Sequence, residues 1–144
     1  MVNTKPASRL SNPQMFLPSS ADGWLPYWQL FVATTALFNT IQNFFTLKLT
    51  QRIYTQQVTP LHARTFAIWT LTSAVVRFYA AYNIHVKAVY DITLFTYLIA
   101  FAHFSSEYFI FRSAKLDIPL LSPFVVSVAS MIWMFMQYDY YVQQ

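Results

Sequence analysis

The stretch AVYDITLFTYLIAFAHFSSEYFIF, residues 88–111, decides how this chain folds. It is apolar or aromatic at most positions, and a helix of this length crosses the roughly 30 Å of hydrocarbon in a bilayer. The stretch therefore predicts a transmembrane helix. It also raises the question of why two polar side chains, His103 and Glu107, lie one helical turn apart inside an apolar stretch.

Three further apolar blocks of similar length occur at about 25–47, 63–83 and 119–138. The second and third blocks are separated by a very short polar joint, so they are expected to form an antiparallel hairpin. The predicted fold class is therefore an all-α membrane protein with four transmembrane helices in a small bundle, the blocks at 25–47, 63–83, 88–111 and 119–138 being the spans.

The two parts of the chain differ sharply in composition. Residues 1–23 are rich in Pro, Ser and Asn and contain no long apolar run, which predicts a flexible polar N-terminal tail. Residues 24–144 are expected to form the four-helix transmembrane domain. Four spans place both termini on the same side of the membrane.

The distribution of Lys and Arg gives an orientation. The tail, the joint at 83–87 and the C-terminus hold three of these residues, and the other two connections hold five. Because cytoplasmic connections carry the excess of positive charge, the count favours lumenal termini.

Composition also excludes several classes of function. The chain is 56% hydrophobic and only 10% charged, and its basic residues are scattered, so no basic face is available for nucleic acid. It has no cysteine, which excludes disulfides and thiolate metal sites. Its three histidines lie in different segments, so no metal centre is expected. Its single glycine, Gly23, cannot form a glycine-rich phosphate turn, so no nicotinamide cofactor is expected.

The polar residues inside the spans need partners. An ionisable side chain at the centre of a transmembrane helix costs about 2.5 kcal/mol or more, so it requires either a partner or a wet cavity. His103 and Glu107 project from one helix face, and Ser106 lies beside them on nearly the same side.

The hairpin geometry suggests which residues pair across it. If the joint is centred on His85, two residues that face each other across the hairpin have residue numbers that add up to about 170. This predicts pairs of Arg64 with Glu107 or His103, and of Arg77 with Asp91. The six residues of this predicted intramembrane polar network either fix the register of the helices or perform acid–base chemistry.

The first span carries a polar stripe of its own. Asn39, Gln42 and Asn43 are spaced by three and four residues, which places them on one face of a helix. Amide side chains in a membrane form hydrogen bonds between helices. This face is therefore a candidate contact either with another helix of the bundle or with a partner protein.

Four runs of residues resemble the ergosterol biosynthetic protein 28 family. They are FNTIQ (38–42), HARTFAIWTLTSAVVRFYAAY (62–82), HFSSEYFIFR (103–112) and SMIWMF (130–135). The resemblance covers about residues 24–141, which is nearly the whole chain except the tail. The combination of ARTFAIWT and HFSSE in this order is its most specific part.

The resemblance implies a multi-pass protein of the endoplasmic reticulum membrane that is not itself an enzyme and has no catalytic residues or cofactor. It implies a scaffold for three partners, the sterol C-4 methyl oxidase, the decarboxylating 3β-hydroxysteroid dehydrogenase and the 3-keto sterol reductase. Tethering would raise the effective concentration of enzymes that share intermediates. Membrane lipid surrounds such a protein, and a symmetric homodimer is a further candidate assembly.

Two alternatives stay open from the sequence. The first is an intramembrane acid–base enzyme, such as a sterol isomerase, in which His103 and Glu107 move a proton. It would need a sterol-sized pocket that reaches both groups. The second is a small transporter, which typically has helices interrupted by Gly or Pro at mid-membrane; the spans here are uninterrupted, which counts against it.

Overall fold

The structure is a computed structural model that describes residues 16–142. The described chain is helical, without a β-strand, which confirms the all-α prediction. Its elements in chain order are η1 (Ser20–Asp22), α1 (Leu25–Phe45), α2 (Lys48–Ile53), α3 (Pro60–Tyr82), α4 (Lys87–Phe109), α5 (Ile118–Met136) and α6 (Tyr138–Val142).

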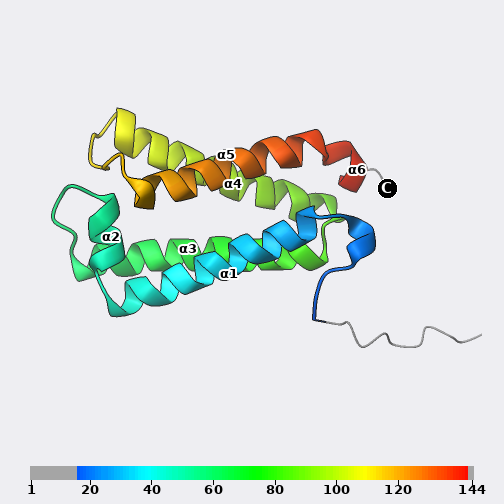
Figure 1. Cartoon of the computed structure of the whole chain (residues 1–144), viewed down its shortest axis with the longest axis horizontal. Helices are drawn as coiled ribbons and strands as arrows, with labels where there is room; N and C mark the ends of the chain where they lie inside the picture. The colour runs from blue at the N-terminus through cyan, green and yellow to red at the C-terminus, as the bar shows by residue number, and fades with distance from the viewer. Residues whose placement is uncertain (1–15, 143–144) are drawn as a thin grey trace, which may run out of the picture.

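The four long helices form two layers, each a pair of antiparallel helices (Figure 1). α1 and α3 form one layer, and α4 and α5 form the other. The short helix α2 lies at one end of the bundle, with the α4–α5 connection. The C-terminal helix α6 and the N-terminal segment lie at the opposite end.

Small side chains let α1 and α3 approach closely. The buried residues of α3 are mostly alanines, and two of those of α1 are alanines as well. The buried alanines of these two helices are Ala33, Ala36, Ala63, Ala67, Ala74, Ala80 and Ala81. Small residues at a helix contact allow extensive van der Waals packing, which is the main attraction between helices in a membrane.

The two layers are joined by buried polar contacts near the middle and at the terminal end. The Tyr97 hydroxyl of α4 donates to Gln29 Oε1 of α1 at 2.7 Å, and both side chains are fully buried. Trp28 Nε1 donates to Ser130 Oγ of α5 at 2.8 Å. Within the second layer, Tyr90 of α4 donates to the Met134 carbonyl oxygen of α5 at 2.7 Å. These buried polar groups thus find their partners on neighbouring helices.

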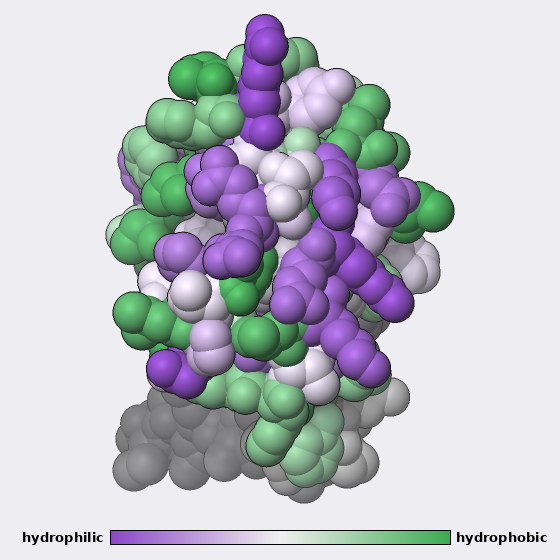
Figure 2. All heavy atoms as spheres, turned by 90° about the vertical axis from the view of Figure 1, so that its left-hand side faces the viewer, coloured by the Kyte–Doolittle hydropathy of each residue, from purple (hydrophilic) through white to green (hydrophobic). Residues whose placement is uncertain are grey.

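Two connections join at the α2 end. Residues Tyr54 and Ala114 form an isolated antiparallel bridge, in which Thr55 N donates to the Ser113 carbonyl and Lys115 N to the Ile53 carbonyl. Figure 2 shows this end of the molecule, where hydrophilic side chains gather in the middle and hydrophobic ones surround them. This distribution suits a helix bundle whose end faces water and whose sides face lipid.

The opposite end is closed by the segment before α1. Most of the expected flexible tail, 1–15, lies outside the described residues, but from Phe16 onward the chain packs on the bundle instead of leaving it. The reason is a set of tyrosine donors, since Tyr27 donates to the Pro18 carbonyl and Tyr82 to the Phe16 carbonyl, both at 2.8 Å. Tyr141 of α6 donates to the Asp22 carbonyl at 2.6 Å.

At this end His85 connects the segment before α1 with α6. We call the three residues Asp22, His85 and Tyr141 the terminal clasp. Nε2 of His85 lies 2.8 Å from Asp22 Oδ1, and its Nδ1 lies 3.2 Å from the Tyr141 carbonyl oxygen. Both neighbours accept hydrogen bonds, so the ring is best satisfied when both nitrogens carry protons. The hydrogen bond with Asp22 is the main cause that raises the pKa of His85, and the Tyr141 carbonyl adds to it.

Two of the long helices are long and apolar enough to cross a membrane. These are α4, with 23 residues, and α5, with 19. α1 and α3 are of similar length, with 21 and 23 residues, but are more polar. The helices begin and end within three residues of the four blocks predicted from the sequence.

The contact between Tyr97 and Gln29 generates a first prediction. Tyr97→Phe leaves the buried Gln29 oxygen without its donor, so we expect a loss of about 1–3 kcal/mol in the free energy of unfolding. Thermal unfolding of the purified protein in mild detergent measures it. Tyr79→Phe, at an exposed tyrosine of α3, is the matched control and should leave the stability unchanged. Equal stability of the two variants would contradict the prediction.

The terminal clasp generates a second prediction. Folding raises the pKa of His85, so protonated His85 stabilises the folded state. This stabilisation is complete when the pH is below the pKa in the unfolded chain, about 6.5, and it is lost as the pH rises through the pKa in the folded protein. We therefore expect hydrogen-exchange protection of residues 16–24 to fall as the pH increases across this range. Asp22→Asn should flatten the dependence, and His62→Gln should not. A pH-independent protection factor in the unaltered protein would contradict this account.

Candidate functional site

His103 lies at the end of the bundle formed by α2 and the α4–α5 connection. Its Nε2 and the Tyr54 hydroxyl share a hydrogen bond of 2.7 Å. Its ring makes an edge contact with Trp69, with 5.0 Å between the ring centroids. The imidazole is therefore held by α3 on one side and by the residue that follows α2 on the other.

Tyr54 is a predominantly buried phenol just after α2. Burial raises the pKa of Tyr54, and the nearby Glu107 carboxylate raises it further. The phenol therefore keeps its proton at neutral pH and is able to donate it to Nε2 of a neutral imidazole.

Glu107 binds the connection that follows its own helix. The Ser113 hydroxyl donates to Glu107 Oε2, and the Ser113 and Ala114 amides donate to the Glu107 carbonyl oxygen at 2.9 and 3.4 Å. His103 thus binds the α2–α3 connection through Tyr54, and Glu107 binds the α4–α5 connection through Ser113. These two connections contact each other through the bridge between Tyr54 and Ala114. The spacing of one helical turn lets one face of α4 reach both.

A cavity of about 420 Å³ opens beside these residues. Its lining includes Tyr54, His62, Trp69, His103 and Glu107. Its volume is within the range of small-molecule sites. The imidazole and the carboxylate thus line one hollow, although each already has a hydrogen-bond partner in the protein.

Two other members of the predicted polar network do not join this site. Arg64 is exposed, and it makes no ion pair among residues 16–142. The predicted pairing of Arg64 with Glu107 or His103 is therefore wrong, because the first turns of α3 leave the Arg64 side chain on the exposed surface at the α2 end of the bundle. Ser106 donates to the carbonyl oxygen of His103 in its own helix.

The predicted pairing of Arg77 with Asp91 is also wrong. Arg77 Nε donates to Thr96 Oγ1 at 3.3 Å, and its guanidinium carbon lies 4.2 Å from the centre of the Tyr97 ring. Asp91 instead accepts from Lys87, four residues earlier, and from Tyr138 at 2.7 Å. The spacing of four residues between Lys87 and Asp91 is a sequence signal for this pair.

The error has a geometric cause. The numbering rule placed Arg77 level with residue 93, and the structure places it against Thr96 and Tyr97, which is about one turn away. Asp91 and Tyr97 are six residues apart, or about 240° around the helix, so they face different neighbours. The rule gives the level of a residue in the hairpin but not the direction of its side chain.

The three residues of the predicted polar stripe on α1 lie in three different environments. Asn43 is buried and accepts from Thr50 Oγ1 of α2 at 2.7 Å. Asn39 is half-buried and lines a second cavity, between the two layers. Gln42 is exposed. One member thus binds within the bundle, and one is available to a partner.

Metal ligation has no obvious place in the described chain. Between residues 16 and 142, no group of three or more His, Asp or Glu side chains is arranged to hold a metal ion.

Comparison with known proteins decides the family. The model of the family described as Erg28 like protein matches residues 25–132. The chain belongs to the Erg28-like family. No solved structure gives a significant match to it.

Relatives in the Erg28-like family align along most of the chain. The Ergosterol biosynthetic protein 28 of Candida albicans is 44% identical over 90% of this chain and 96% of its own length. The protein of the same name from Schizosaccharomyces pombe is 50% identical over 78% of this chain and 83% of its own. The Ergosterol biosynthetic protein 28 homolog of Homo sapiens is 41% identical over 74% and 79%.

The bond between Tyr54 and His103 generates a third prediction. Tyr54→Phe and His103→Phe each remove this bond, and we expect each to lower the free energy of unfolding by about 1 kcal/mol. Because both remove the same interaction, the double variant should be less destabilised than the sum of the two. Thermal unfolding in detergent measures all three.

The neighbouring Tyr108→Phe is the control. Tyr108 is half-buried in the same part of α4, and its hydroxyl has no hydrogen bond within residues 16–142. Additive effects in the double variant would show that the bond does not contribute to stability.

Proposed function

We propose that this chain is a non-catalytic scaffold of the endoplasmic reticulum membrane that crosses the bilayer four times. It tethers the sterol C-4 methyl oxidase, the decarboxylating 3β-hydroxysteroid dehydrogenase and the 3-keto sterol reductase. Support comes first from the relatives, whose names refer to ergosterol biosynthesis and not to a reaction.

The distribution of polarity carries the proposal that all four long helices span the membrane. α1 and α3 bury polar side chains, including Gln29, Asn43 and Arg77, and expose large apolar ones. The exposed apolar residues of these two helices include Phe31, Leu37, Phe38, Ile41, Phe44, Ile68, Val75 and Phe78. Such an arrangement is unfavourable in water but suits hydrocarbon, where polar groups face the interior of the bundle. It also explains why these helices are less apolar on average than α4 and α5.

The proposed orientation places the α2 end in the cytosol. Five basic residues lie in or beside the connections at this end: Lys48, Arg52, Arg64, Arg112 and Lys115. An excess of positive charge favours the cytosolic side, so the termini would be lumenal.

Gln42 marks a face of α1 that suits a partner protein. It is exposed beside Phe38, Ile41 and Phe45, which are exposed as well. An amide that faces lipid gains by bonding to another transmembrane helix. We assign the tethering contact to this face.

An affinity purification tests the scaffold and generates a fourth prediction. The tagged chain, extracted from membranes in mild detergent, should carry the three sterol enzymes with it. Gln42→Leu should reduce their recovery without lowering the amount of the scaffold. Quantitative mass spectrometry measures both. Thr34→Val is the control, because Thr34 is exposed on α1 but its hydroxyl already donates to the Leu30 carbonyl.

Failure to recover any of the three enzymes under several extraction conditions would refute the scaffold. Loss of recovery in both variants would refute the assignment to the Gln42 face and leave the scaffold standing.

The second candidate is an acid–base sterol isomerase that uses His103 and Glu107. The cavity beside them favours it, because both groups line one hollow. The partners of the two groups count against it, since Tyr54 bonds the imidazole and Ser113 bonds the carboxylate. Turnover of a sterol by the purified chain, abolished by His103→Phe, would establish the isomerase in place of the scaffold.

A further inference from the structure

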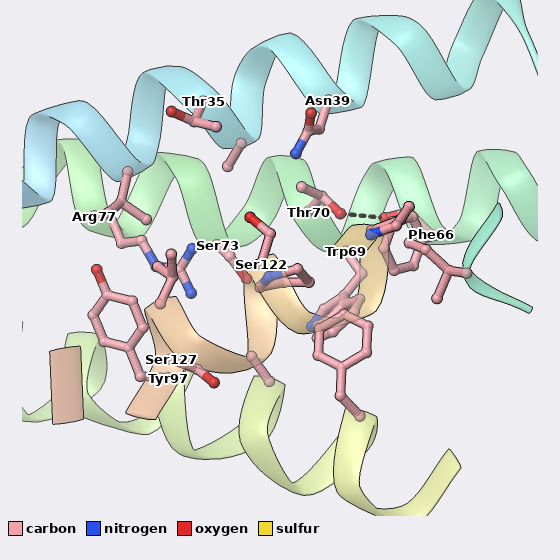
Figure 3. Close-up of a pocket in the computed structure, with 18 of the residues that line it drawn as sticks. Thr35, Asn39, Phe66, Trp69, Thr70, Ser73, Arg77, Tyr97, Ser122 and Ser127 are labelled. Atoms are coloured by element: carbon pink, nitrogen blue, oxygen red, sulfur yellow. Dashed lines mark hydrogen bonds between the residues drawn. The ribbon is translucent and has the colours of Figure 1, made fainter. Parts of the chain in front are cut away.

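A second cavity, of about 310 Å³, lies between the two layers of helices (Figure 3). All four long helices contribute to its walls. Among its lining residues, Phe31 and Thr35 of α1 and Ser122 of α5 are exposed, which places its mouth between these two helices. In the proposed topology this mouth opens sideways into the bilayer.

Among the described residues that line this cavity, Arg77 is the only charged one. It is 8% exposed, and Figure 3 shows its guanidinium turned away from α3 toward Tyr97. Its contacts are the Thr96 hydroxyl and the face of Tyr97, which are both neutral. Within residues 16–142 no carboxylate pairs with it, and only one of its five N–H donors has a bond.

A buried guanidinium in this state lacks a counter-ion. Removing an ion from water is costly, and only an opposite charge with good geometry repays that cost. The cation–π contact with Tyr97 stabilises the charge but leaves the terminal nitrogens available. The site therefore calls for one anion that enters the cavity.

The rest of the cavity indicates the shape and polarity of the molecule to which the anionic group would belong. Phe66 and Arg77, both in the wall, are eleven residues apart on α3, or about 16 Å along its axis. Apolar side chains cover much of the surface between them, including Val32, Ala36, Ala100, Phe104 and Val126. The hollow is long and mostly apolar, with polar side chains such as Ser73 and Ser127 in its wall, and it is charged toward one end.

We propose that this cavity binds an amphiphile with a single carboxylate. The carboxylate accepts hydrogen bonds from Arg77, and the apolar body lies between the layers toward Phe66 and Trp69. A planar carboxylate matches the fork of a guanidinium and balances one positive charge with one negative charge. A dianionic phosphate would leave a net negative charge in the bundle. This site goes beyond scaffolding and would stand even if no sterol enzyme travelled with the protein.

Trp69 provides a reporter for the test. Bromine atoms quench tryptophan fluorescence on contact, so a dibrominated stearic acid in the cavity should quench Trp69 of the full chain in lipid nanodiscs. The brominated alcohol of the same chain length is the matched neutral probe. At mildly alkaline pH, where the acid is ionised, we expect the acid to bind about tenfold more tightly or better, as a charge-assisted hydrogen bond provides.

Two arginine variants locate the charge. Arg77→Met should remove the preference for the acid over the alcohol, and Arg64→Met, at an exposed arginine of the same helix, should retain it. Trp69→Phe should abolish the part of the quenching that depends on Arg77. The comparison of acid with alcohol in the unaltered protein tests the proposal even if Arg77→Met fails to fold.

Competition distinguishes two sources of the carboxylate. Displacement of the probe by oleic acid assigns an acyl chain, and displacement by cholanic acid assigns a four-ring body. Either result supports the site. Equal quenching by the acid and the alcohol, or equal displacement by oleyl alcohol and cholesterol, would overturn it.

Discussion

The requirement that buried polar groups satisfy one another governs this structure. The hydrogen bond between Tyr97 and Gln29 shows it most directly, because both side chains are fully buried and they belong to different layers. A buried polar group has no water to bond, so each layer needs the other to complete its hydrogen bonds. The alanine seam between α1 and α3 supplies close packing within a layer, and the polar contacts then fix how one layer sits on the other.

The same requirement explains the pair that stands inside the apolar stretch at 88–111. His103 reaches Tyr54 after α2, and Glu107 reaches Ser113 after α4. One helical turn separates them because the two connections that they hold lie side by side and are joined by a bridge. Their positions at the α2 end of the bundle, where hydrophilic side chains gather, also limit the cost of burying ionisable groups.

The sequence was a good guide to the helices and a poor guide to their faces. Long apolar blocks bounded by polar connections locate the four long helices, because length and polarity are properties of a segment alone. The partner of Arg77 depends on how α3 and α4 are rotated, and apolar residues on every side of both helices conceal that rotation. Tyr54 was missed for a related reason: it lies in a polar connection, and only the folded chain brings it to His103. The six residues of α2 are too few to show a helical period.

The order of synthesis adds a consequence. The seam between α1 and α3 joins segments close together in the chain, so the first layer is able to close while the rest is still being translated. The partners of Trp28 and Gln29, Ser130 and Tyr97, lie 102 and 68 residues further on. The nascent protein therefore contains an indole N–H and an amide oxygen before their acceptor and donor have been synthesised. A message truncated ahead of α5 would yield a chain whose first layer is packed and whose Trp28 stays unsatisfied, which is a state that cellular quality control has reason to remove.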